Sequence, residues 1–136
     1  MTDFASISNE NCTALPLGSR SVYFDVSSRV MNGASDTSIR RVDVSIDGGK
    51  TWRNAALQSP VLPICHTRFR LPWRWDGKDA ILQSRCVDTT GYVQPTLGQL
   101  IAVRGLNGPL GSIYHLNAIQ SWRVAADGKV TNVHAY

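Results

Sequence analysis

The sequence predicts an all-β fold, a sandwich of roughly seven or eight strands. Eight short runs of alternating apolar and polar residues follow one another, separated by Gly, Pro, Asn and Asp. No window of eleven or more residues carries a helical period, so the runs favour strands. The chain of 136 residues is 43% hydrophobic and 18% charged, a composition typical of a globular domain with its own core.

The expected elements follow the chain in a simple order. Residues 1–18 are polar and aperiodic, so we expect an irregular lead-in, followed by one domain over residues 19–136. Asp47–Gly49 and Asp127–Gly128 each predict a hairpin, because Gly adopts positive φ and Asp bonds the backbone of its own turn. The expected strands cover residues 21–26, 39–46, 51–57, 68–75, 80–88, 100–105, 118–126 and 129–136.

The run at residues 68–75 could be a core strand or a single-stranded nucleic-acid groove. Its large apolar side chains share one parity and its arginines share the other, namely Phe69, Leu71, Trp73 and Trp75 against Arg68, Arg70 and Arg74. A stacking platform needs exposed rings, and the sandwich would then lose its largest core residues. The pattern favours a core strand and no nucleic-acid partner. Pro72 lacks an N–H, so the strand should be an edge or carry a bulge there.

Charge and cysteine content exclude several classes of function. The formal net charge is +4 and most of the excess is arginine, which suits carboxylate and oxyanion partners but also occurs on ordinary solvated surfaces. No apolar run is long enough for a membrane span, so no membrane partner is expected, and the first residues do not read as a secretory signal. Three cysteines without a C-x-x-C pair argue against a disulfide framework and a structural zinc site.

Residues 45–52 match S-x-D-x-G-x-T-W, the Asp-box hairpin known from sialidases and related propellers. We expect Ser45, Asp47, Gly49 and Trp52 to be structural, with Asp47 accepting backbone N–H groups and Trp52 packing beneath the turn. A propeller needs several copies, and this chain has one. Because no nucleophile, metal or phosphate-loop motif is present, we expect no catalytic, cofactor-binding or metal-binding residues in this chain. A binding function, as a stand-alone adhesive or carbohydrate-binding sandwich, therefore remains open for this chain.

Three stretches together resemble one family. They are "VDVSIDGGKTWRNAAL", "LPWRWDG" with "ILQSRCVDTTGYVQP", and "VRGLNG" with "YHLNAIQSW". The combination resembles the C-terminal dimerisation domain of molybdopterin-dependent sulfite oxidases and their bacterial relatives. Its last part is most similar to the sulfane (sulfite) dehydrogenase subunit of the bacterial thiosulfate-oxidising system. The resemblance covers residues 39–136, and residues 21–37 fit it less well.

This resemblance implies an immunoglobulin-like sandwich that forms a homodimer. It also implies that the Mo-molybdopterin cofactor and its cysteine ligand belong to a preceding α/β domain that this chain lacks. The chain alone should then neither hold the cofactor nor oxidise sulfite or a protein-bound sulfane sulfur. For the parent enzyme, the resemblance implies a c-type haem subunit as a partner and a periplasmic location.

The resemblance carries one substrate-binding residue onto this sequence. Arg104, in "VRGLNG", matches an arginine that reaches the anion pocket near molybdenum, and a guanidinium suits bidentate binding of sulfite or sulfate. The alternative is an arginine that only braces a loop. Tyr114, His115 and Asn117 are further candidates around that pocket. Asp88 should tie its strand end to the "TTGY" turn.

Overall fold

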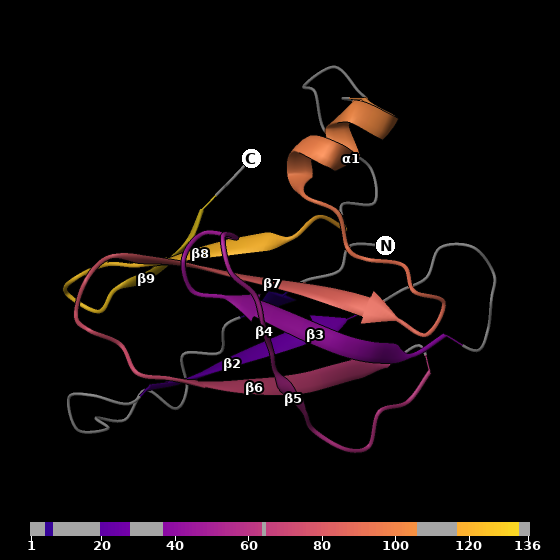
Figure 1. The fold of residues 1–136 in the computed structure, drawn as a ribbon, viewed down its shortest axis with the longest axis horizontal. Helices are drawn as coiled ribbons and strands as arrows, with labels where there is room; N and C mark the ends of the chain where they lie inside the picture. The colour runs from indigo at the N-terminus through magenta and orange to yellow at the C-terminus, as the bar shows by residue number, and fades with distance from the viewer. Residues whose placement is uncertain (1–4, 7–19, 28–36, 64, 106–116, 134–136) are drawn as a thin grey trace.

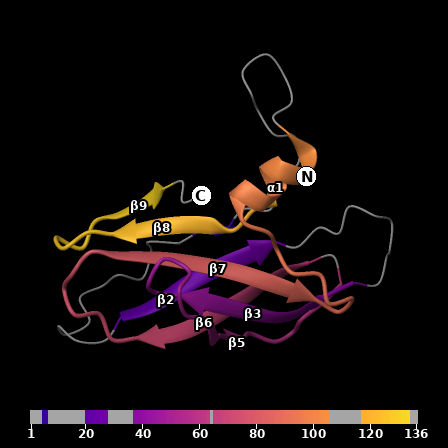
Figure 2. The same cartoon turned by 45° about the horizontal axis from the view of Figure 1, so that its top comes forward.

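Two antiparallel sheets pack face to face and confirm the predicted sandwich (Figure 1). The computed structural model describes residues 5–6, 20–27, 37–63, 65–105 and 117–133. One sheet has the strand order β1-β2-β6-β5 and the other the order β4-β3-β7-β8-β9. Among these residues one short helix, α1, forms, and it lies outside the five-stranded sheet, on the side away from β6 (Figure 2).

The two predicted hairpins are confirmed, since β3 pairs with β4 and β8 pairs with β9. The four-stranded sheet consists of β1 (Ala5–Ser6), β2 (Arg20–Ser27), β5 (Ala56–Leu57) and β6 (His66–Trp73). The five-stranded sheet consists of β3 (Ile39–Ser45), β4 (Arg53–Asn54), β7 (Ala80–Asp88), β8 (Gln120–Val124) and β9 (Val130–Val133).

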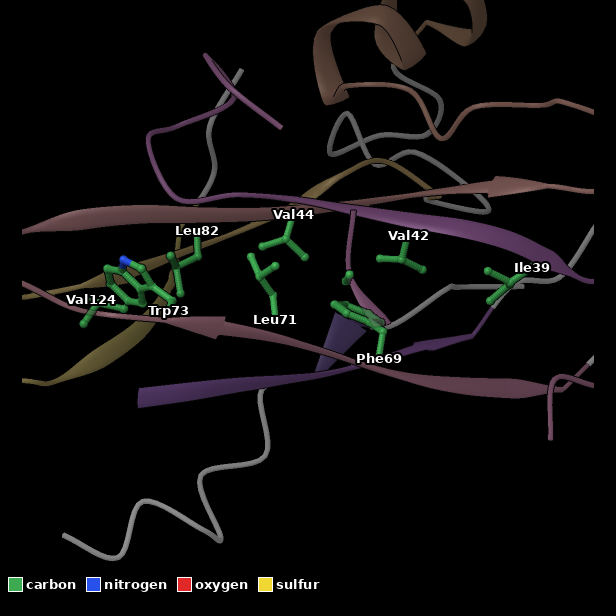
Figure 3. Packing of buried hydrophobic residues seen from close by; sticks show 9 residues of the cluster. Ile39, Val42, Val44, Phe69, Leu71, Trp73, Leu82 and Val124 are labelled. Carbon is green, nitrogen blue, oxygen red and sulfur yellow. The ribbon is translucent and has the colours of Figure 1, made fainter. Parts of the chain in front are cut away.

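The core lies between the sheets and contains the predicted face of residues 68–75. Phe69 is 0% exposed and Leu71 and Trp73 are buried, whereas the arginines of the other parity are exposed, namely Arg68, Arg70 and Arg74. Figure 3 shows Val42 and Val44 of β3 pointing from the opposite sheet toward these side chains. The alternation of the strand therefore separates an apolar inner face from a basic outer face.

The expected strand at residues 51–57 is divided between the two sheets. Its first part, β4, pairs with β3, and the N–H of Ala55 still donates to the carbonyl of Val42 at 2.8 Å. Ala56 is already paired with β6. The same register would place Pro72 opposite Asn54, but Asn54 belongs to β4 and pairs with Asp43 of the other sheet. Strand β6 therefore lies between two other strands of its sheet, but its β5 side is unpaired at Pro72. A residue without an N–H requires such an unpaired position.

Within residues 1–18, Ala5 and Ser6 form β1, which pairs with β2. One expectation was wrong. Residues 100–105 are not a strand, because residues 97–104 form helix α1 (Leu97–Arg104). The helix is too short to show a helical period of apolar residues over eleven positions. The sequence indicates it only through its capping residues. Residues 134–136 of the last expected strand lie outside the described residues.

Candidate functional site

Helix α1 is defined by a capping residue at each end. Thr96 caps its start: the Thr96 hydroxyl accepts from the Gln99 N–H at 3.1 Å, and the Gln99 side-chain oxygen accepts from the Thr96 N–H at 2.9 Å. This reciprocal pair is a capping box. Gly105 caps the end with φ of 67°, and its N–H donates to the Ile101 carbonyl at 2.8 Å. The glycine after Arg104 thus ends the helix and leaves Arg104 in its last turn.

A tight turn directly follows β7, and Asp88 holds it as expected. The buried Asp88 carboxylate accepts from the Thr90 N–H at 2.8 Å, the Thr90 hydroxyl at 2.6 Å and the Tyr92 N–H at 3.0 Å. Gln94 lies further along this segment. Its side-chain oxygen accepts from the Cys86 N–H at 3.2 Å, and its side-chain nitrogen donates to the Ala118 carbonyl at 3.1 Å. These bonds anchor the segment before α1 to β7 and to the chain entering β8.

The hairpin at residues 45–52 lies against β7 on the other side of the site. The Asp47 carboxylate accepts from the Lys50 and Thr51 N–H groups at 3.1 and 2.9 Å and from the Thr51 hydroxyl at 2.6 Å. These bonds hold the pKa of Asp47 far below its usual range, with the Thr51 hydroxyl as the largest contribution. The Ser45 hydroxyl donates to Asp47 at 2.7 Å and accepts from the Gly49 N–H at 2.8 Å.

Gly49 and Trp52 bring this hairpin close to the sheet. A Cβ on Gly49 would lie 2.6 Å from the side-chain oxygen of Gln83, and its φ is 90°. Only glycine fits that position without displacement. The Trp52 indole N–H donates to the Gly49 carbonyl at 3.1 Å, which fixes the ring over the sheet.

The hairpin, the outer face of β7, the turn and α1 enclose a groove of about 920 Å³. We call it the α1 groove. Its rim is apolar, since Val103 is 85% exposed and Tyr92 is 51% exposed. Arg85 and Arg104 both line it, and its described lining contains no aspartate or glutamate. The groove is therefore cationic with apolar walls, a combination that suits an anionic ligand or partner group.

Arg85 is held in place on the floor of the groove. Its Nε lies 3.3 Å from a carboxylate oxygen of Asp43, and its Cζ lies 4.1 Å from the centroid of the Trp52 ring. Arg41 shares the same buried carboxylate, with Nε at 3.0 Å. One negative charge therefore faces two guanidinium groups, and a positive excess remains at the groove.

Only part of the predicted substrate site can be located. Arg104 lies on the α1 groove. Asn117 donates from its side-chain nitrogen to the Tyr92 hydroxyl at 3.2 Å, and its side-chain oxygen is buried without a hydrogen-bond partner within the described chain. Tyr114 and His115 lie outside the described residues. Sequence reasoning missed Arg85, although its parity with Gln83 and Val87 on β7 could have placed it on the outer face of the sheet.

No three His, Cys, Asp or Glu side chains gather among the described residues in a way that could hold a metal ion. The polar side chains that line the α1 groove are guanidinium, amide, hydroxyl and indole groups, which suit anions rather than molybdenum. Helix α1 is too short to cross a membrane, and nothing else in the described chain forms such a helix.

Comparison with known proteins identifies the family. The model of the Mo-co oxidoreductase dimerisation domain matches residues 30–122. The chain belongs to this family. The dimerisation domain is also similar to a solved structure, the sulfane dehydrogenase SoxCD from Paracoccus pantotrophus, with 41% sequence identity and a TM-score of 0.79. That match covers 100% of this chain and 33% of the other, so the domain spans a third of its relative's length. No curated protein matches the sequence.

Proposed function

We propose that this chain is the dimerisation part of a molybdenum-cofactor oxidoreductase that oxidises a sulfur oxyanion or a sulfane sulfur. It forms the homodimer contact and supplies Arg104 to the substrate pocket. The family match and the 41% identity to a sulfane dehydrogenase support the reaction class. Residues 19–136 act as the domain, with the molybdopterin held by another part of the parent enzyme. We propose a periplasmic location and a c-type haem subunit as the electron-accepting partner.

The position of Arg104 is the observation that carries its role. It lies in the last turn of α1, where Gly105 ends the helix, and it lines a groove whose described wall has no carboxylate. A guanidinium at this site is suited to an incoming oxyanion.

The role of Arg104 is tested by kinetics on the parent enzyme. Arg104→Gln should raise the KM for sulfite at least tenfold, since one charge-assisted bidentate contact is worth roughly 1.5–3 kcal/mol. Arg40→Gln is the matched control, because Arg40 is exposed on β3 and does not line the groove. Equal kinetic constants for the two variants would refute the assignment.

The oligomeric role is tested on this chain by light scattering at tens of micromolar. We expect a dimer mass, and a monomer at that concentration would contradict the proposal. The alternative of a carbohydrate-binding module gains little support, because the described residues expose one aromatic ring strongly, that of Tyr92, rather than a platform of several.

A further inference from the structure

Arg85 is bound on one side and open on the other. Its Nε donates to Asp43 and the Trp52 ring lies against its guanidinium plane. Within the described chain, its two terminal amino groups make no hydrogen bond, and the side chain is 30% exposed. A guanidinium has five N–H donors, and four of them belong to those amino groups. The fixed end therefore presents an open fork of donors.

This fork faces the α1 groove. Arg85 lines the groove together with Arg104, and the described lining contains no aspartate or glutamate. Asp43 does not cancel the charge, since Arg41 binds its other oxygen at 3.0 Å. Apolar groups such as Val103 and Tyr92 at the rim lower the local dielectric constant, which strengthens attraction for an anion.

Trp52 and Asp43 also lower the entropic cost of binding. An exposed arginine loses rotamer freedom when it binds a ligand, whereas Arg85 is already ordered by a stacked ring and a carboxylate. The hairpin at residues 45–52 thereby holds an arginine that lies 33 positions beyond Trp52 in the sequence. Its part in the site is to position Arg85.

We propose that Arg85 is a second oxyanion-binding residue of the α1 groove, which binds a sulfur oxyanion through its two terminal amino groups. The choice of a sulfur oxyanion rests on the proposed function, whereas the site itself rests on the contacts of Arg85. The competing explanation is that Arg85 only fastens the hairpin to β7. In that case its terminal amino groups would not respond to anions.

Side-chain NMR of the ¹⁵N-arginine-labelled chain separates these explanations. Sodium sulfate is exchanged for sodium chloride at constant ionic strength while the Nε–H signals are followed. We expect the Arg85 and Arg104 signals to move along one saturation curve, while the exposed Arg40 signal does not saturate. Arg85→Lys keeps the positive charge but loses the fork, and should weaken sulfate binding about tenfold. The unchanged indole N–H signal of Trp52 would show that this variant keeps the hairpin.

The possible results decide between the two assignments. If Arg104 responds and Arg85 does not, Arg85 is a structural brace and our inference fails while the proposed role of Arg104 stands. If Arg85 responds and Arg104 does not, the inference stands and the role of Arg104 fails. No saturable response in either overturns both. A titration with acetate tests the ligand class: saturation at lower acetate than sulfate would overturn the sulfur oxyanion in favour of a carboxylate.

Discussion

The Asp88 turn offers a quantitative test of how the α1 groove is supported. One oxygen of this buried carboxylate accepts two backbone N–H groups and one hydroxyl. Asp88→Ala removes all three bonds. A typical hydrogen bond contributes about 1 kcal/mol net, so the free energy of unfolding should fall by about 3 kcal/mol. For a domain of this size the loss corresponds to a decrease in Tm of roughly 10 °C.

Two further variants test the physical reasoning. Asp88→Asn keeps a side-chain oxygen for the three donors but loses the negative charge, so we expect a loss of about 1 kcal/mol. Asp127→Ala is the control, since the Asp127 carboxylate accepts one bond, from the Lys129 N–H at 2.9 Å, in an exposed turn. It should cost about 1 kcal/mol or less.

Urea denaturation, followed by tryptophan fluorescence, measures all three variants. The midpoint should shift while the m-value stays constant. The reasoning is refuted if Asp88→Ala costs no more than Asp127→Ala. It is also refuted if Asp88→Asn is as damaging as Asp88→Ala, because the loss would then follow from the charge rather than from the three bonds.

Three other changes test the hairpin and the helix. The folded state depresses the pKa of Asp47, so the ionised carboxylate stabilises the protein at pH values above the ordinary aspartate pKa. This stabilisation is lost as pH falls toward the pKa of the folded state. Asp47→Asn should therefore flatten the acid limb of a stability–pH profile, and an unchanged limb would contradict this. Thr96→Ala removes the capping box and should cost about 1 kcal/mol, with faster amide exchange in α1 but not in β7. Gly105→Ala places a Cβ at φ of 67° and should cost about 1 kcal/mol in thermal unfolding, whereas Gly98→Ala within α1 should not destabilise.

Features set by neighbouring residues could be predicted from the sequence. The alternation at Phe69, Leu71 and Trp73 gave the buried face of β6, because side chains of a strand alternate strictly. The hairpin at residues 45–52 is held by bonds between residues two to four positions apart, so a local motif is sufficient to predict it. The helix could also have been found, since Thr96, Gln99 and Gly105 are its start and stop signals.

Features set by the pairing of distant strands could not be predicted. No residue type marks Ala55 as the point where the chain changes sheets, because the change depends on where β3 and β6 end up relative to each other. The contact between Arg85 and Asp43 follows from the register of β3 and β7, in which these two residues are direct partners. The α1 groove depends on both features and so requires the folded chain.

The proline in β6 has a consequence for self-association. On the β5 side, the pairing with β6 ends at Ala56 and Arg70, and the described chain places no strand beside Pro72 there; an open backbone edge can recruit a strand from another molecule. The carbonyl of Arg68 faces β5, where it accepts from the Gln58 N–H at 2.7 Å, so the nitrogen of Pro72 faces the same open side. That nitrogen carries no hydrogen to donate, and the exposed Arg70 and Arg74 lie on either side of it in the sequence. Pro72 thereby protects the domain against edge-to-edge aggregation, a risk for any protein that associates through a β-sandwich.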